Sequence, residues 1–352
     1  MNHDDPKLLD QRKLDHLLLC AEQDVEHRHR GTLLGDVRLI HDSLPELDVS
    51  AIDLSVELVG RRLAAPVMIS GMTGGTARAK EVNRVLAQVA EEFGLAFGVG
   101  SQRAMMRDPA QVETYAVRDV APTALILGNI GVVQAAASTT AEVRELVEAI
   151  GADALCVHLN PGQEIVQDHG DRDFRGCVDA LGRLVAELGV PVIAKETGCG
   201  MSRRTLQQLH DVGVRTVDVS GAGGTTWVGV EALRSQTHNA TIGDVLWDWG
   251  VPTAASVAWA HEAGMEVIAS GGIRNGLDIG RSLALGATVG SCALPWLRAA
   301  FDGGIEPARA LARTLIDTVR AVMLLTSSPD VASLRRCPRV IGPELQRWLE
   351  QR

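Results

Sequence analysis

The sequence lacks the excess of basic charge and the long apolar runs that mark several large classes of protein. Its 34 lysine and arginine residues stand against 44 aspartate and glutamate residues, so the formal net charge is -10. A charge of this sign disfavours binding to nucleic acid or to an anionic membrane surface. The longest apolar stretch, residues 120–137, contains Pro122, Gly128, Asn129 and Gln134. We therefore expect two short buried segments there and no membrane span.

Cysteine is scarce and has no metal-binding or redox pattern. The six cysteines form no C-x-x-C pair, and 352 residues with 46% hydrophobic content can build a core without disulfide bonds. The first residues are polar and lack the apolar region of a signal peptide. These absences lead us to expect reduced and largely buried cysteines in a cytoplasmic protein.

The pattern that is present is a regular alternation of short apolar runs with amphipathic segments. The apolar runs predict eight buried parallel strands, at residues 66–70, 95–99, 124–127, 154–158, 191–195, 215–219, 266–269 and 288–292. Helical periodicity is found between them, at residues 78–93, 140–150, 175–188, 202–212, 253–263 and 276–285. A glycine closely follows each of these six helices, where a left-handed cap favours it.

Eight strands alternating with helices predict an α/β fold of the (β/α)8 TIM-barrel type, which needs about 250 residues. The alternative is an open doubly wound sheet, which is disfavoured because no G-x-G-x-x-G motif follows an early strand. We expect residues 1–65 to form an N-terminal extension with a helix near 10–26, and residues 66–325 to form the barrel. Residues 306–325 predict its last long helix, and residues 326–352 predict a tail of short helices.

Glycines and polar residues follow the predicted strands, at the end where such barrels carry their active sites. The turn Ser270-Gly271-Gly272 follows the seventh strand and opens a helix, and Ala293 and Leu294 follow the eighth. Backbone N–H groups in such turns can hold a phosphate, a recurring feature of these two barrel loops. The alternative is a tight strand-to-helix turn that merely requires small residues.

Lys195 stands at the end of the fifth strand. It could face the ring of a planar cofactor, together with Ser101, Asn129 and residues 71–76, or it could simply extend its ammonium group to solvent. The fourth strand is followed by a loop with Glu164, a candidate for holding Mg²⁺ beside phosphate oxygens. The alternative for this loop is an ordinary solvated turn.

An ordered series of motifs resembles the type 2 isopentenyl diphosphate isomerases. It runs from about residue 12 to the C-terminal helices, and each motif is weak alone, whereas the combination is specific. The matching stretches are Arg12-Lys13-Leu14-Asp15-His16, Met72-Thr73-Gly74-Gly75, Ser101-Gln102-Arg103, His158-Leu159-Asn160, Gln163-Glu164, Gly170-Asp171-Arg172-Asp173-Phe174, Lys195-Glu196, Ser220-Gly221-Ala222-Gly223-Gly224-Thr225 and Ser270-Gly271-Gly272-Ile273-Arg274.

The resemblance implies conversion of isopentenyl diphosphate to dimethylallyl diphosphate with reduced FMN, Mg²⁺ and NADPH as the reductant of the flavin. It implies FMN contacts from Met72, Thr73, Gly74, Ser101, Asn129, Lys195, Ser220 and Thr225, and phosphate contacts from Gly271, Gly272, Ala293 and Leu294. The implied substrate contacts are Arg12, Lys13, His16, Ser101, Gln102, Arg103, His158, Asn160 and Gln163, with Gln163 near the reacting carbons. Glu164 would bind Mg²⁺, and the subunit would form a homo-tetramer or homo-octamer.

The chain departs from the expected family pattern at two places. Asp168-His169 stands where many members have Pro-Glu, and Thr326-Ser327 stands where they have Thr-Gly. Two other functions stay open: an FMN-dependent 2-hydroxy-acid oxidoreductase and a non-catalytic barrel that binds FMN or an isoprenoid. The first is disfavoured because the segment after residues 266–269 offers Arg274 but no histidine base.

Overall fold

The computed structural model describes residues 6–351, and of residues 6–11 and 302 the backbone alone. Eight parallel strands close into a barrel, so the predicted TIM-barrel fold is confirmed. In the order of their pairing, the strands are β10 (Glu266–Ala269), β11 (Val289–Cys292), β4 (Val67–Ile69), β5 (Ala96–Gly98), β6 (Leu125–Gly131), β7 (Ala154–Leu159), β8 (Val192–Glu196) and β9 (Thr216–Asp218). Each overlaps one predicted apolar run.

The strands are apolar throughout because both of their faces are covered. Residues of β4, β5, β8 and β9 are buried without exception. One set of side chains, such as Met68, Ile193 and Ile268, fills the barrel interior. The alternate residues, such as Ile69 and Val217, pack outward against the helices. This two-sided burial is what separates a parallel barrel strand from a half-exposed antiparallel one.

The helices around the barrel begin and end close to the predicted residues. Thr76 caps the first turn of α2 by accepting from Ala79, and left-handed Gly94 (φ 62°) ends it. Thr139 and Glu142 form a capping box on α5. The predicted helices appear as α2 (Ala77–Phe93), α5 (Thr140–Ala149), α7 (Cys177–Glu187), α8 (Arg203–Asp211), α11 (Thr253–Glu262), α12 (Gly276–Ala284) and α14 (Ile305–Leu325).

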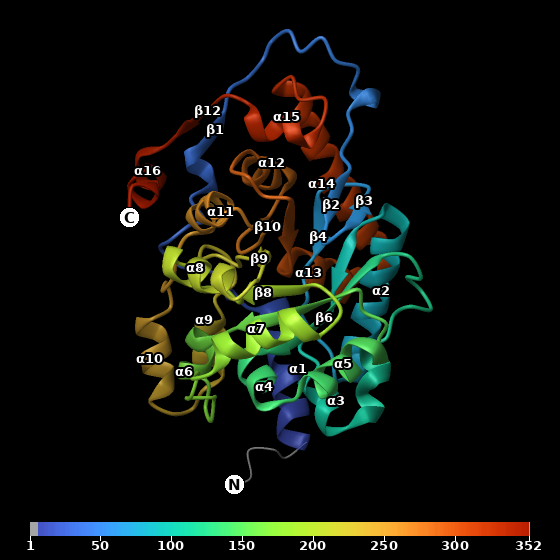
Figure 1. Cartoon of the computed structure of the whole chain (residues 1–352), viewed down its shortest axis with the longest axis vertical. Coiled ribbons are helices and arrows are strands. Elements are labelled where there is room, and N and C mark those ends of the chain that lie inside the picture. The colour runs from blue at the N-terminus through green and yellow to red at the C-terminus, as the bar shows by residue number, and fades with distance from the viewer. Residues whose placement is uncertain (1–5, 352) are drawn as a thin grey trace.

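The N-terminal extension contributes to both ends of the barrel. The hairpin of β2 (Val56–Leu58) and β3 (Arg61–Leu63) inserts Leu58 and Leu63 into the interior cluster at the strand N-termini. Helix α1 (Pro6–Glu22) lies at the opposite end, as Figure 1 shows. The helix ends at Glu22, four residues earlier than expected.

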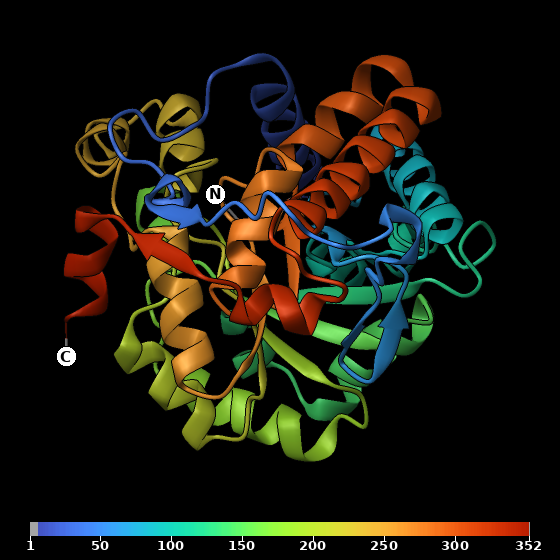
Figure 2. The same ribbon diagram turned by 90° about the horizontal axis from the view of Figure 1, so that it is seen from above.

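The C-terminal tail differs from the prediction of short helices alone. Besides α15 (Val331–Arg336) and α16 (Pro343–Leu349), it contains β12 (Arg339–Ile341), which pairs antiparallel with β1 (Val37–Leu39). The two strands lie side by side in Figure 2. A three-residue strand has no periodicity of its own, and its partner is 300 residues away, so the sequence carried no signal for it.

The remaining helices were not predicted because they are short or interrupted. They are α3 (Arg103–Arg107), α4 (Val132–Ala137), α6 (Pro161–Val166), α9 (Trp227–Arg234), α10 (Asn239–Val245) and α13 (Leu294–Gly303). All six cysteines are free, and all but Cys199 are buried. Within residues 6–351, no helix combines the length and the hydrophobicity required to cross a bilayer.

We expect Leu58→Ala to lower the free energy of unfolding by about 2–5 kcal/mol, because Leu58 is fully buried where the hairpin closes the barrel. Urea unfolding followed by circular dichroism measures the change. Leu44→Ala is the control, since Leu44 is 82% exposed, and it should change the free energy by less than about 0.5 kcal/mol. Equal effects of the two substitutions would contradict the proposed closing role of the hairpin.

Candidate functional site

A single cavity opens where the C-terminal ends of the barrel strands meet helix α1. Every residue predicted for the cofactor, substrate or metal site lines it, with the exception of Gln102. The lining also includes residues to which the sequence gave no role, among them Ser70, Gly100, Gln134, Gln167, Thr197, Trp227, Arg274 and Cys292. The predicted residues therefore converge on one place although they are spread over about 280 positions of sequence.

Gln102 lies behind the cavity wall. Its side chain is fully buried, donates from Nε2 to the Leu146 carbonyl at 2.8 Å, and accepts at Oε1 from the Asn129 amide at 2.9 Å. These bonds join α3, α5 and β6. The structure therefore does not support the substrate contact expected of the Gln102 side chain, and assigns it to holding the strand end that carries Asn129.

Lys195 points into the cavity from β8 and forms a buried ion pair. Its Nζ lies 2.6 Å from Oδ2 of Asp218, and the other carboxylate oxygen of Asp218 accepts from the Ser270 hydroxyl. The β8–β9 register places Lys195 directly beside Asp218. Removing one member of such a pair leaves a buried charge, which is strongly destabilising. Asp218 fixes the cation in place, and its isolated charge within an apolar run was the available sequence signal.

The predicted phosphate turn is built from glycines for a steric reason. Gly271 (φ 92°) and Gly272 (φ 74°) have left-handed conformations. A Cβ on Gly271 would lie 2.1 Å from the Gly221 carbonyl oxygen, so no side chain fits there. The start of α13 lies beside this turn, and its N-cap residue Ala293 makes no side-chain cap. Backbone N–H groups are thus presented to the cavity in an arrangement suited to an anion.

Arg274 follows this turn, lines the same cavity and pairs with Glu26 of the N-terminal segment. A second cation therefore lies near the glycine turn, where it could contact a phosphate. The sequence placed Arg274 within a motif but assigned it no role.

The loop after β8 is held by a carboxylate that the sequence reasoning did not assign. Oε2 of buried Glu196 accepts from four successive backbone N–H groups, those of residues 197–200, at 2.5–3.1 Å. Burial raises the pKa of Glu196 to about 7, against the opposite effect of these bonds. The arrangement fixes Thr197 at the cavity wall.

Glu164 on α6 is the predicted metal ligand and is only 6% exposed. It accepts from Asn160 Nδ2 at 2.9 Å, from Gln167 Nε2 at 3.2 Å and from the Asp171 amide at 2.7 Å. Burial raises its pKa, and the Asp171 amide opposes that shift. Within the described part of the chain, no three His, Cys, Asp or Glu residues gather as a metal site. A cation at Glu164 would therefore need phosphate and water oxygens as further ligands, which suits Mg²⁺.

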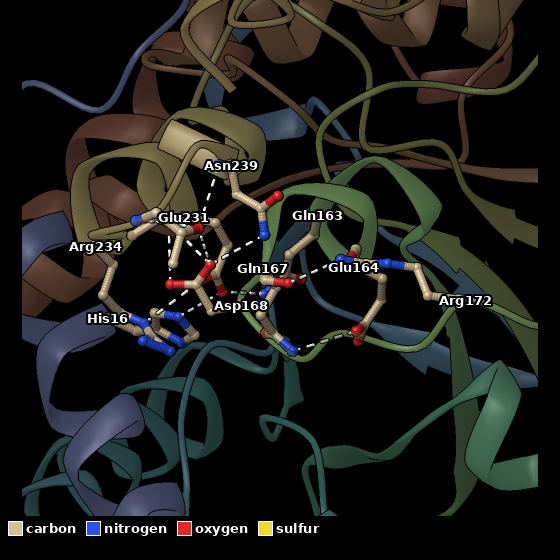
Figure 3. Close-up of polar contacts among 11 residues, drawn as sticks. His16, Gln163, Glu164, Gln167, Asp168, Arg172, Glu231, Arg234 and Asn239 are labelled. Carbon is tan, nitrogen blue, oxygen red and sulfur yellow. Dashed lines mark hydrogen bonds and ion pairs between the residues drawn. The ribbon is translucent and has the colours of Figure 1, made fainter. Parts of the chain in front are cut away.

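Glu231 on α9 is the central residue of a polar cluster that the sequence reasoning missed. Only 1% exposed, its Oε1 lies 2.8 Å from His16 Nε2 and accepts from Gln163 Nε2 at 3.1 Å. Figure 3 shows His16, Gln163 and Arg234 around it. Burial acts to raise the pKa of Glu231, but the hydrogen bond and charge of His16, together with Arg234 and Gln163, outweigh it and lower the pKa. Glu231 was missed because α9 was not predicted.

Helix α1 packs on the barrel of its own chain and brings cations to the mouth. Lys13 Nζ donates to Tyr115 Oη at 2.6 Å, and that hydroxyl donates to the Ser101 carbonyl at 2.8 Å. The His16 ring meets Trp227 edge-on, with centroids 5.1 Å apart. Burial lowers the pKa of Arg12, and Arg103 lowers it further. These cations give an acidic protein a local site for a multiply charged anion.

His158 lies at the end of β7, with Nδ1 2.8 Å from Asn129 Oδ1. The ring is enclosed by protein except on the cavity side. Desolvation lowers its pKa to about 4, and the charges of Lys195 and Arg103 add to the effect. His158 is therefore neutral at pH 7, with one ring nitrogen that donates and one that accepts. With Nδ1 donating to Asn129 Oδ1, Nε2 accepts a hydrogen bond from a ligand. With the Asn129 amide turned so that its Nδ2 donates to Nδ1, Nε2 donates to a ligand oxygen.

This lowered pKa predicts how stability depends on pH. The unfolded chain takes up a proton on His158 near pH 6.5, whereas the folded chain resists protonation until about pH 4. The stability associated with neutral His158 is therefore complete above pH 6.5 and is lost as the pH falls toward 4. We expect the parent to lose roughly 3 kcal/mol of unfolding free energy over this range that His158→Gln does not lose. Chemical denaturation at several pH values measures it, and exposed His41→Gln should follow the parent.

Comparison with known proteins agrees with this geometry. A family model described as FMN-dependent dehydrogenase matches residues 6–160 and 134–338. The chain is 44% identical over 346 residues to the isopentenyl-diphosphate delta-isomerase of Methanosarcina barkeri, which covers 97% of this chain and 94% of that protein. The isopentenyl-diphosphate delta-isomerase of Pyrococcus horikoshii is 42% identical over 353 residues, with the same coverage of the two chains.

Among solved structures, a mandelate oxidase variant with (S)-mandelic acid superposes with a TM-score of 0.65. It covers 96% of this chain and 98% of that one, but its sequence identity is 17%, which shows a shared fold alone. The two isopentenyl-diphosphate delta-isomerases are instead 42–44% identical to this chain over 97% of its length, which shows the family as well as the fold. On this evidence, the chain belongs to the isopentenyl-diphosphate delta-isomerase family, on the barrel fold of the FMN-dependent dehydrogenases.

Proposed function

We propose that this protein converts isopentenyl diphosphate to dimethylallyl diphosphate. The reaction would use Mg²⁺ and FMN, and NADPH would keep the FMN reduced. The observation that carries the proposal is the arrangement of the cavity. A glycine turn and Lys195 line one part of it, and the cations of α1 with Glu164 line another. The homologues' names agree with this activity.

The residues on the barrel side fit FMN. Gly271, Gly272, Ala293 and Leu294 would hold its phosphate, and Arg274 would add a charge there. Thr73, Ser101, Asn129, Ser220 and Thr225 would bond its polar edges, with Met72 and Gly74 against the ring and Lys195 beside its anionic region. Reduced flavin supplies an electron-rich ring that can stabilise positive charge and exchange a proton.

The residues on the α1 side fit a diphosphate. Arg12, Lys13 and Arg103 supply fixed positive charge, and His158 and Asn160 supply neutral hydrogen-bonding groups. Glu164 would hold Mg²⁺ against the diphosphate oxygens. Binding the charged end firmly orients the apolar end, where the double bond moves. Because α1 covers the mouth with its own side chains, it would also exclude water from that end.

Moving the double bond requires adding a proton at one carbon and removing one from another. Gln163 lies at the cavity wall, and its amide cannot itself gain or lose a proton at neutral pH. Its Nε2 is bonded to Glu231, which is bonded in turn to His16. We propose that Gln163 orients the reacting end, and that the Glu231–His16 pair holds the exchangeable proton near it.

We expect the purified protein to be yellow, and the reduced enzyme with Mg²⁺ to form dimethylallyl diphosphate from isopentenyl diphosphate under anaerobic conditions. Product formation is followed by acid lability of the allylic diphosphate. The oxidised enzyme and the enzyme treated with a chelator serve as controls, and both should be inactive. Oxidation of 2-hydroxy acids without any allylic product would instead indicate the oxidoreductase alternative, and bound flavin with neither activity would indicate a binding protein.

We expect Glu164→Gln to lose at least about 100-fold in activity while retaining FMN, because the substitution removes the charge that would hold Mg²⁺. Steady-state rates at several Mg²⁺ concentrations and the flavin absorbance measure the two effects. Exposed Glu81→Gln should change neither. Full turnover of Glu164→Gln without metal dependence would show that Glu164 has a different role.

A further inference from the structure

A tight turn after α6 has an unusual backbone conformation. The Gly170 amide donates to the Gln167 carbonyl at 3.0 Å, and the third residue, His169, has φ 62°. A positive φ at the third residue, with none at the second residue Asp168, is the mark of a type II turn. Glycine normally occupies the third position, and a left-handed non-glycine residue costs about 1–2 kcal/mol. The neighbouring structure must therefore hold His169 in this conformation.

The turn encloses the carboxylate of Glu164. The Asp171 amide, which follows the turn, donates to Glu164 Oε2 at 2.7 Å. A Cβ on Gly170 would lie 2.2 Å from the Glu164 carbonyl and 2.7 Å from its Oε2, so the backbone approaches as closely as glycine allows. Arg172 also donates to the Glu164 carbonyl. The orientation of the carboxylate thus depends on the conformation of this turn.

Asp168, the second residue of the turn, fastens it to another part of the protein. Its carboxylate accepts from Ser235 Oγ at 3.0 Å, from Thr237 Oγ1 at 2.7 Å and from Asn239 Nδ2 at 3.0 Å. These donors lie between α9 and the start of α10, and Figure 3 shows Asn239 reaching toward Asp168. The same α9 carries Glu231, which is bonded to Gln163 on α6.

We propose that Asp168 is a positioning residue, which fixes the turn and thereby orients Glu164 for its metal. The proposal rests on the function proposed above. Proline is favoured at the second position of a type II turn because its ring sets φ covalently. Gln167 has ψ 128°, the extended conformation that a residue before proline prefers. Here three hydrogen bonds to the Asp168 carboxylate restrain the backbone of the turn, as a proline ring would do covalently. They also connect the segment after α6 to the α9–α10 junction.

The experiment measures metal binding directly, without turnover. FMN-loaded parent, Asp168→Ala, Asp168→Asn and Asp168→Pro are titrated with Mn²⁺ in the presence of inorganic diphosphate, and free Mn²⁺ is counted by electron paramagnetic resonance. We expect Asp168→Ala to weaken Mn²⁺ binding about tenfold, the lower limit for residues that support a metal ligand. Asp168→Asn retains an oxygen that can accept some of the three hydrogen bonds, so its Mn²⁺ affinity should fall less. The Mn²⁺ affinity of Asp168→Pro should stay within about threefold of that of the parent.

The control is Asp48→Ala. Asp48 also accepts from a serine hydroxyl and amide, at 2.8 Å each, but it lies in the segment between β1 and β2. It should leave Mn²⁺ binding unchanged, and all variants should retain FMN. The Mg²⁺ concentration for half-maximal isomerase activity should rise in Asp168→Ala, whereas the rate at saturating Mg²⁺ should not fall in proportion.

Two results would overturn the inference. One is an Asp168→Ala protein, or Asp168→Asn if the alanine variant fails to fold, that binds Mn²⁺ as tightly as the parent. The other is a folded Asp168→Pro protein that binds Mn²⁺ as weakly as Asp168→Ala. The proline ring should restrain the turn in place of the three hydrogen bonds, so this result would show that the turn does not orient Glu164. If either result is obtained and the parent enzyme isomerises isopentenyl diphosphate, the inference about Asp168 is wrong and the proposed function stands. A parent that binds Mn²⁺ with diphosphate but forms no allylic product sinks the proposed function instead.

Discussion

The parallel closure of the barrel is the constraint on which the site depends. Neighbouring parallel strands place equivalent residues side by side, so register decides which side chains meet. His158 on β7 lies beside Lys195 on β8, and Lys195 lies beside Asp218 on β9. A shift of one residue in either pairing would turn these side chains to the opposite face of the sheet. The floor of the cavity is therefore a direct consequence of backbone hydrogen bonding.

Local electrostatics explain how an acidic protein can offer a site to an anionic substrate. The net charge of -10 is spread over the molecule, whereas the mouth gathers arginine and lysine residues from α1 and α3. The carboxylates in the same region, Glu164 and Glu231, are buried and surrounded by hydrogen-bond donors. Such carboxylates are held in single orientations, which suits a metal ligand and a proton-holding group.

Short, irregular elements supply most of the precision at the mouth. Helix α6 has six residues, and its orientation depends on contacts with α9 and with the turn that follows it. The N-terminal helix α1 buries Leu17 and Cys20 in the core, and polar contacts from Lys13 to Tyr115 and from His16 to Glu231 fix its cavity face. Barrel strands provide a rigid base, and these loops and short helices adapt it to one substrate.

The sequence by itself determined the barrel, because each strand is covered on both faces and each outer helix has one apolar face. It also marked the strand-end residues Lys195 and Glu164, since polar groups after apolar runs are conspicuous. Only the tertiary structure revealed the partners of these residues. Asp218 lies 23 positions from Lys195, and Glu231, which binds the Gln163 side chain next to Glu164, lies 68 positions from Gln163. The burial of Gln102 and the β1–β12 pair were likewise decided by packing between distant segments, which no local periodicity encodes.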